Sequence, residues 1–291
     1  NKNFGASHPS NSRTDNGLVG SETISAITYL YEGTGSTTYS SSSTPPTDAG
    51  TYSITPQVSA LSGGDLNNYE ITYDSSTLTI AKINQSSLSI SSASTATYGQ
   101  DLTLSTTGGS GTGSITFAKV SGDCTLNNSG ATYSITPGDA GNTCVVSASK
   151  AADNNYNVIS SSNQTITIAK ANQTLTFTST PSSTLINSTY TPTITSTHSI
   201  SGVTTGITPT FDIANSSNSI CSLIGLVITF NRAGTCEIEA DAICSTNYEA
   251  ATTTSQIITV TNPPASSSPR NNPTPTPSAS PNTAQRNNPI R

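Results

Sequence analysis

The sequence has little charge, few aromatic rings and few of the residue types that commonly mark a catalytic or binding site. Its 291 residues include no Met, no Trp and two His, and charged residues make up 9% of the chain. The ten Lys and Arg residues are scattered, so no basic face exists for nucleic acid or anionic lipid. No run of about 20 apolar residues is present, which predicts no membrane-spanning helix.

Neither an initiating Met nor a signal peptide stands at the N-terminus. We therefore expect the chain to be a piece of a longer protein, and the missing leader does not argue against secretion. Apolar residues make up only 32% of the chain, which alone would suggest disorder. Disorder usually also needs a high net charge, and the formal net charge here is −6. Thr alternating with Ile is instead typical of a sheet with one face in water.

Short motifs recur in the same order along the chain. Thr79-Ile80-Ala81-Lys82 returns as Thr167-Ile168-Ala169-Lys170, and Tyr52-Ser53-Ile54-Thr55-Pro56 returns as Tyr133-Ser134-Ile135-Thr136-Pro137. A chain that repeats itself at this spacing is typically an array of similar small domains. We therefore predict a first repeat (1–82), a second repeat (83–170), a third repeat (171–261) and a final segment (262–291).

The joints between these repeats are short. Lys82-Ile83-Asn84-Gln85 and Lys170-Ala171-Asn172-Gln173 leave only two or three residues between the last strand of one repeat and the first strand of the next. Short joints restrict relative motion, so we expect an extended array. The final segment is rich in Pro, Ser, Thr and Asn and has almost nothing to bury, so we expect it to be disordered or polyproline-like.

The strand signals predict an all-β fold of tandem immunoglobulin-like antiparallel β-sandwiches. Stretches of alternating polarity or continuous apolar character lie at 69–73, 77–80, 87–90, 165–168, 174–177, 226–230 and 235–240. Clusters of Gly, Asp and Ser separate them and indicate turns. Residues 148–153 form the only stretch that resembles a helix, and it is too short for us to predict one.

The five cysteines lie in the second and third repeats. Pairing within repeats predicts the disulfides Cys124–Cys144 and Cys221–Cys236, each stabilising its repeat by about 3 kcal/mol through loop closure. Cys244 is then unpaired, and Cys236–Cys244 is a rival pairing. Five reduced, buried thiols are the alternative without disulfides. No Cys-x-x-Cys pair or His cluster is present, so we predict no metal site.

Three tyrosines recur at one position near the end of each repeat: Tyr69, Tyr156 and Tyr248. We expect each ring to pack on the core while its hydroxyl caps a backbone group, as in a tyrosine corner. A sugar-stacking platform is the alternative. His8 and His198 stand in polar, turn-like segments, and we expect both to be solvated surface residues.

No arrangement of residues indicates catalysis, so we predict no catalytic or cofactor-binding residue and no enzyme activity. Serines are numerous, but no Gly-x-Ser-x-Gly elbow supports a nucleophile. Calcium bound by the acidic loop residues Asp65, Asp123, Asp139 and Asp153 remains an alternative, although none of them falls in an Asp-x-Asp-x-Asp-Gly pattern.

Residues of the first repeat resemble the MBG family, the mostly β, glycine-rich immunoglobulin-like repeats of bacterial surface and secreted proteins. The resemblance rests on Phe4–Pro9, Gly17–Ile24, Asp48–Pro56, Asn68-Tyr69 and Leu78–Ile80, and it covers most of 1–82. The strand that should precede Phe4 is missing, so we expect a shortened first repeat. The second and third repeats are similar to neighbouring bacterial immunoglobulin-like repeats that carry a cysteine pair.

The repeats and the resemblance together imply a structural stalk or spacer in a bacterial cell-surface or secreted protein, supporting adhesion. We expect an extracellular monomer that does not bind nucleic acid, with a glycan or surface-protein ligand bound by regions outside this sequence. Two alternatives stay open. The chain is a carbohydrate- or calcium-binding module, or it is an accessory region of an extracellular hydrolase.

Overall fold

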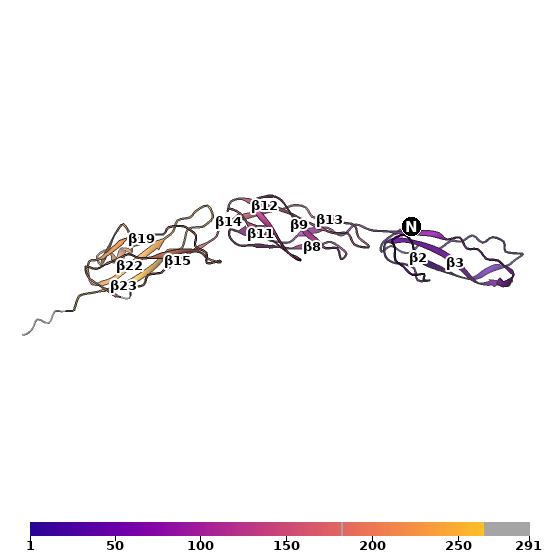
Figure 1. The fold of residues 1–291 in the computed structure, drawn as a ribbon, viewed down its shortest axis with the longest axis horizontal. Helices are drawn as coiled ribbons and strands as arrows, with labels where there is room; N and C mark the ends of the chain where they lie inside the picture. The colour runs from indigo at the N-terminus through magenta and orange to yellow at the C-terminus, as the bar shows by residue number, and fades with distance from the viewer. Residues whose placement is uncertain (182, 265–291) are drawn as a thin grey trace, which may run out of the picture. The chain divides into compact units, whose positions relative to one another are not determined.

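The computed structural model describes residues 1–181 and 183–264, and their regular secondary structure is almost entirely strand (Figure 1). Within them, the helical elements are two 3-10 turns, η1 (Leu66–Asn68) and η2 (Asn215–Ser217). The chain is therefore all-β, as predicted. The helix-like stretch at 148–153 begins as the end of a strand. Most of the final segment, for which we predict disorder, lies outside the described residues.

The first repeat forms one four-stranded sheet in the order β1-β4-β3-β2. Its strands are β1 (Lys2–Asn3), β2 (Thr23–Gly33), β3 (Gly50–Ser62) and β4 (Ser76–Ala81). β2 and β3 make a long antiparallel hairpin, and alternate side chains of the sheet reach a small core. The four buried members of that core are Tyr31, Tyr52, Leu78 and Ile80.

The strand predicted at 69–73 is wrong, because a backbone turn bond and a side-chain contact, rather than a strand ladder, hold this segment. The Tyr69 N–H donates to the Leu66 carbonyl oxygen and so closes η1. The Tyr73 hydroxyl accepts a hydrogen bond from the Val58 N–H of β3 at 3.1 Å. A polar contact at each end leaves the segment beside the sheet without joining it. The alternating pattern alone could not reveal this.

The second repeat has two sheets and a short ladder. The orders are β10-β11-β7 and β13-β12-β14-β6, with β9 also paired to β12, and β5 pairs with β8. The strands are β5 (Leu88–Ile90), β6 (Thr95–Thr97), β7 (Leu102–Leu104), β8 (Thr106–Gly108), β9 (Ile115–Gly122), β10 (Cys124–Ser129), β11 (Thr132–Pro137), β12 (Thr143–Lys150), β13 (Ile159–Ser160) and β14 (Gln164–Ala169). Ile135, Val146 and Ile166 are fully buried in its core.

The third repeat has sheets in the orders β16-β23-β22-β19 and β17-β21-β20, together with a β15–β18 ladder. Its strands are β15 (Gln173–Phe177), β16 (Ser183–Leu185), β17 (Thr189–Tyr190), β18 (Ile194–His198), β19 (Thr210–Ile213), β20 (Cys221–Ile224), β21 (Val227–Phe230), β22 (Gly234–Asp241) and β23 (Thr254–Thr261). The strands predicted at 174–177, 226–230 and 235–240 are confirmed as β15, β21 and β22.

Each repeat departs from a purely antiparallel arrangement in the same way. A short strand near the start of each repeat runs parallel to the last strand of the same repeat, as β1 with β4, β6 with β14 and β16 with β23. The sequence did not indicate these pairs, because a strand of two or three residues is too short to show alternation.

By compactness the chain divides into two units. The first comprises Asn1–Phe177, Ile194–Thr210 and Ala240–Thr254, and the second comprises Thr178–Thr193, Phe211–Glu239 and Ser255–Arg291. All residues at the first junction (around 82–83) and at the second junction (around 170–171) that are discussed below belong to the first unit. The repeat boundaries at 82, 170 and 261 stay predictions.

Two valines of the second repeat that differ in burial provide a test of its core. Val146 on β12 is fully buried, whereas Val158 in the same repeat is 63% exposed. We expect Val146→Ala to lower the free energy of unfolding of the second repeat by about 2 kcal/mol, because it leaves a cavity. Val158→Ala should change it by less than about 0.5 kcal/mol. Urea-dependent hydrogen exchange, read on peptides of the second repeat, measures both. Equal effects would contradict the core described here.

Candidate functional site

Two disulfides link the sheets of the second and third repeats. Cys124 opens β10 and joins Cys144 on β12, with a Cα–Cα distance of 5.7 Å. Cys221 opens β20 and joins Cys236 on β22 at 5.9 Å. In both cases the bond connects strands of two different sheets. Cys244 is free and exposed, so the rival pairing Cys236–Cys244 is not formed.

The first repeat has a tyrosine where the other repeats have a disulfide cysteine. Tyr52 follows Ala49 by three residues, as Cys236 follows Ala233. The Tyr52 side chain is 2% exposed, and its hydroxyl donates to the Asp48 carbonyl oxygen at 2.7 Å. Burial raises the pKa of the Tyr52 hydroxyl, since the charged phenolate would lose hydration. A buried ring thus occupies the position that a disulfide holds elsewhere.

The recurrent tyrosines do not all make the same contacts. Tyr156 packs edge-to-face on Phe4 with ring centroids 5.5 Å apart, and Tyr248 packs on Tyr98 at 5.6 Å. In each pair, the partner ring lies in the preceding repeat. These two tyrosines therefore meet an aromatic ring across a junction, a contact that the tyrosine-corner interpretation did not include.

Tyr69 comes closest to the predicted role. Its hydroxyl donates to the Glu22 carboxylate and accepts from the Val19 N–H at 3.3 Å, so it caps a backbone group. The hydrogen bond to Glu22 raises the pKa of the Tyr69 hydroxyl, because the carboxylate favours the protonated phenol. The three tyrosines therefore share a sequence position but not a set of contacts.

Side-chain caps hold the turns that carry Tyr156 and Tyr248. We call residues 153–156 and 245–248 the Asn-Tyr turns. In the first, Asp153 Oδ1 accepts the N–H groups of both Asn155 and Tyr156 at 2.9 Å. In the second, Ser245 Oγ accepts the corresponding two N–H groups, at 3.3 and 3.2 Å. Two residue types thus perform one capping role.

Asp153 has a further partner that Ser245 lacks. Its Oδ2 accepts the Thr112 N–H at 2.6 Å, and this bond and the bond from the Asn155 N–H lower the pKa of the Asp153 carboxyl. Gly111 makes room for that contact, because a Cβ there would lie 2.1 Å from Asp153 Oδ2 and the backbone φ is +74°. The carboxylate is therefore engaged in holding two loops together.

The backbone of each joint is hydrogen-bonded to the Asn-Tyr turn of the repeat that comes after that joint. The backbone of Ile83 forms a parallel bridge with Tyr156, and Ala171 forms the same bridge with Tyr248. Ile83 N–H donates to the Asn155 carbonyl oxygen at 3.1 Å, which is one of the two hydrogen bonds of the first bridge. The joints are thus hydrogen-bonded segments of structure.

A buried glutamine reinforces each joint. Gln85 and Gln173 end the recurrent Lys-x-Asn-Gln motif, and both are buried. Each Nε2 donates to two carbonyl oxygens that flank the Asn-Tyr turn: Ala151 O and Asn157 O for Gln85, and Ile243 O and Glu249 O for Gln173. Our sequence interpretation used this motif only as a boundary. The recurrence of this motif at both joints could have indicated that its glutamine has a structural role.

Both histidine predictions are wrong, because neither side chain is a solvated surface group. His8 is partly buried, with Nε2 3.0 Å from the Pro46 carbonyl oxygen. His198 is 2% exposed, and its Nδ1 accepts the N–H groups of Ile200 and Ser201 at 3.1 Å. Since Nδ1 accepts, Nε2 carries the hydrogen and donates to the Tyr98 carbonyl oxygen at 3.0 Å. The prediction failed because the neighbours of His198 in the sequence are polar, and they do not indicate that its side chain contacts the preceding repeat.

The acidic loop residues stabilise turns. Asp123 Oδ2 accepts the Asp139 N–H at 2.8 Å and an Asn142 Nδ2–H at 2.9 Å, and these bonds lower the pKa of the Asp123 carboxyl. Asp65 accepts hydrogen bonds from Asn67. Within residues 1–181 and 183–264, no group of three or more His, Cys, Asp or Glu side chains is arranged to hold a metal ion. The same residues include no helix long and apolar enough to cross a membrane.

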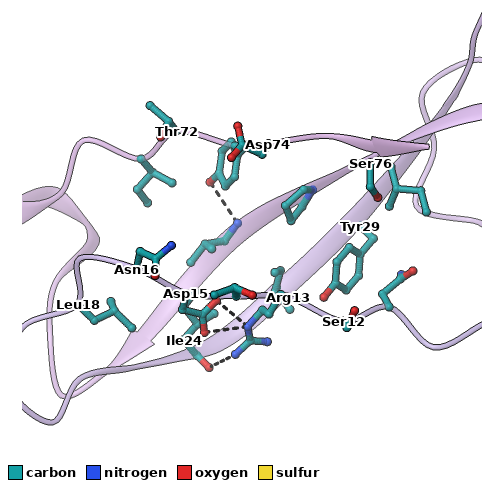
Figure 2. A pocket seen from close by; sticks show the side chains of 18 of the residues that line it. Ser12, Arg13, Asp15, Asn16, Leu18, Ile24, Tyr29, Thr72, Asp74 and Ser76 are labelled. Carbon is teal, nitrogen blue, oxygen red and sulfur yellow. Dashed lines mark hydrogen bonds and ion pairs between the residues drawn. The ribbon is translucent and has the colours of Figure 1, made fainter. Parts of the chain in front are cut away.

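The first repeat also contains a cleft of about 670 Å³ (Figure 2). Apolar side chains of β2 and β3 form its floor, including Ile24, Tyr29 and Val58. Polar residues of the loops at 9–16 and 69–74 form its walls. The sequence did not predict this cleft, because it results from two irregular segments lying over one sheet.

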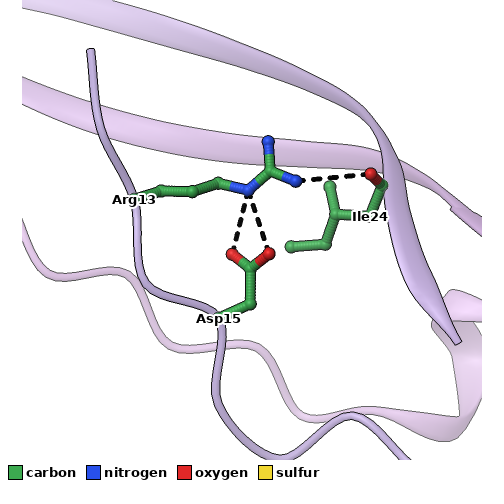
Figure 3. Close-up of polar contacts among 3 residues, drawn as sticks. All are labelled: Arg13, Asp15 and Ile24. Carbon is green, nitrogen blue, oxygen red and sulfur yellow. Dashed lines mark hydrogen bonds and ion pairs between the residues drawn. The ribbon is translucent and has the colours of Figure 1, made fainter. Parts of the chain in front are cut away.

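An ion pair shapes one wall of the cleft (Figure 3). Arg13 Nε donates to both carboxylate oxygens of Asp15 at 3.0 Å, and Nη2 donates to the Ile24 carbonyl oxygen at 3.4 Å. The hydrogen bond with Asp15 raises the pKa of the Arg13 guanidinium. The pair ties the 9–16 loop to β2.

Comparison with known proteins supports the family resemblance in the first repeat. Residues 1–79 match the family described as MBG domain (YGX type), which confirms the resemblance seen in the sequence. No curated protein matches this chain.

Several solved structures of repeat proteins resemble the chain at low identity. Fibronectin(III)-like modules of Clostridium thermocellum CbhA are 16% identical, with a TM-score of 0.25 and coverage of 60% of this chain and 94% of that one. Domains 4–9 of the surface layer protein SbsC are 13% identical, with a TM-score of 0.26 and coverage of 84% and 40%. FdeC, an Escherichia coli adhesin, is 16% identical, with a TM-score of 0.23 and coverage of 74% of each chain.

The two capping residues predict different responses to acid at the two junctions. The lowered pKa of Asp153 means that its stabilising bonds are present above the unfolded pKa of about 3.8 and are lost as the pH falls through the folded pKa. We expect the amide chemical shifts of Asn155 and Tyr156 to change below about pH 4. Those of Asn247 and Tyr248 should change less, because Ser245 does not titrate there. An NMR titration checks this, and equal changes at both turns would contradict it.

Proposed function

We propose that this chain, whose residues 1–79 match the MBG domain of the YGX type, is a structural spacer of tandem immunoglobulin-like repeats in a bacterial cell-surface or secreted protein. In this role it supports adhesion performed by a region outside this sequence. The observation that carries the proposal is the shared construction of the two joints. In both, a backbone bridge and a buried glutamine fix the linking residues, as a spacer of defined geometry requires.

The disulfides support an extracellular location. Each lies between two sheets, where it limits unravelling of its repeat. Disulfides of this kind persist in oxidising surroundings, such as the bacterial surface, and are rare in the cytosol. The abundance of Ser and Thr keeps the exposed strand faces polar with little charge.

We further infer that the chain is not an enzyme. Several side chains that could carry catalysis are engaged in structural hydrogen bonds within the described residues. Asp123 and Asp153 cap loops, and His198 is buried with both ring nitrogens bonded to backbone groups. The spacer proposal therefore assigns binding and catalysis to other parts of the protein.

Pulling on single molecules tests the mechanical part of this proposal. The disulfides close segments of 20 and 15 residues, which should stay hidden when their repeats unfold under force. At about 3.6 Å per residue, reduction should lengthen one unfolding step by about 70 Å and another by about 50 Å. The step of the first repeat should not change. A Cys244→Ser chain is the control for disulfide exchange, and unchanged steps in reductant would contradict the proposal.

Carbohydrate binding is the second candidate function, and the cleft of the first repeat favours it. The lining includes the rings of Tyr29, Tyr69 and Tyr73 beside polar groups such as Asn11 and Glu70, and sugars bind to such mixtures of ring faces and hydrogen-bonding groups. Calcium binding and an accessory role beside an extracellular hydrolase have no comparable observation in their favour.

A glycan array probed with the whole chain separates the two functions. A spacer should give no specific signal, whereas a carbohydrate-binding module should bind at micromolar concentrations and lose binding on Tyr29→Ala. Tyr133→Ala is the matched control, because Tyr133 lies in the second repeat, away from the cleft. Specific binding that depends on Tyr29 would overturn the spacer proposal as stated.

A further inference from the structure

One asparagine side chain makes two hydrogen bonds across the first junction. Asn155 Oδ1 accepts the Ala49 N–H at 2.7 Å, and Asn155 Nδ2 donates to Asp48 Oδ1 at 3.0 Å. Asp48 and Ala49 stand just before β3 in the first repeat, whereas Asn155 lies in the Asn-Tyr turn of the second. The amide therefore uses its acceptor on a backbone group and its donor on a carboxylate of the preceding repeat.

The second junction repeats this arrangement with different residues. Asn247 Oδ1 accepts the Ala140 N–H at 2.8 Å, and Asn247 Nδ2 donates to Asp139 Oδ1 at 2.9 Å. Asp139-Ala140 is the recurrence of Asp48-Ala49. We call these two dipeptides the corners of the first and second repeats. The same four atoms thus meet at both junctions, although the repeats differ in length and in disulfide content.

The chemistry explains why these residue types recur. An amide side chain offers one acceptor and one donor, and each corner offers one N–H donor and one carboxylate acceptor in matching order. A hydrogen bond to a charged group is stronger than one between neutral groups. An aspartate in place of the asparagine would set two carboxylates against each other. The edge-to-face pairs Phe4–Tyr156 and Tyr98–Tyr248 join the same repeats.

We propose that the corner and the Asn-Tyr turn form a head-to-tail recognition pair that holds consecutive repeats in one relative orientation. The partner of each corner is a neighbouring immunoglobulin-like repeat that presents an asparagine in such a turn. This inference concerns how the repeats join, and it stands whether the array is a spacer or a binding module. It also gives a role to the aspartate side chain in the recurrent Asp-Ala-Gly motif.

The third repeat shows how the pair discriminates. The position that corresponds to Asp139 is occupied by Arg232, in Arg232-Ala233-Gly234. A guanidinium has only donors, so it cannot accept a hydrogen bond from an asparagine amide. The corner of the third repeat therefore lacks the group that the other two corners offer. The aspartate selects which corner accepts a following repeat of this kind.

A charge exchange in the whole chain tests the pair directly. Asn155→Asp should place a carboxylate against Asp48 and so weaken the junction. Hydrogen exchange of the Ala49 N–H should become about 10-fold faster. Residual dipolar couplings of 1–82 and of 83–170 should then no longer fit the same alignment tensor. The double variant Asp48→Asn with Asn155→Asp should restore both readouts, because donor and carboxylate have changed sides. Asn154→Asp is the matched control: it adds the same charge to the same turn at an exposed position.

The second junction provides an independent repeat of the experiment. Asn247→Asp should act on the Ala140 N–H as Asn155→Asp acts on that of Ala49, with Thr246→Asp as its control. Asp139→Arg, which copies the third corner, should have the same effect. Hydrogen exchange in β3 and β12 should stay unchanged in all variants and shows that the repeats remain folded. The proposal is overturned if Asn155→Asp behaves like Asn154→Asp, or if the double variant fails to restore the junction.

Discussion

Scarcity of apolar side chains is the constraint on which this structure depends. Each repeat has only a few fully buried residues with which to close its sheets, such as Ile135, Val146 and Ile166 in the second. A core of this size supplies little stability, and a covalent link between sheets offsets that limit. The disulfides of the second and third repeats provide this link, whereas the buried Tyr52 ring packs at the corresponding place on the single sheet of the first.

Charged side chains are also scarce, and several of those that are present have structural roles. Charged residues make up only 9% of the chain, and several of its carboxylates fix backbone geometry. Asp123 and Asp153 accept N–H groups in turns that would otherwise have no secondary structure to hold them. At the joints, the buried side chains of Gln85 and Gln173 instead donate hydrogen bonds to backbone carbonyl oxygens. Carboxylates and amides engaged in this way have little capacity left for a ligand, which agrees with a structural role.

Junctions built from such groups differ from flexible linkers. At each joint, the linking residues are held by the backbone bridge and the buried glutamine. The aromatic pair adds a contact between the two repeats that the joint connects. The asparagine bonds to the corners add specificity, because they require a complementary pair of residues on two repeats. Stability within a repeat and recognition between repeats therefore rest on different residues, and mutation can separate them.

Local patterns in the sequence determined the all-β class, most strand positions and the family resemblance of the first repeat, because strand alternation and turn residues act over a few neighbours. Only the tertiary structure decided that Tyr69–Tyr73 is not a strand, that each repeat has a parallel pair, and that a cleft lies over the first sheet. It also buried His198 and brought Asn155 to Asp48. These features depend on residues far apart in the chain, and no local pattern records which distant groups will meet.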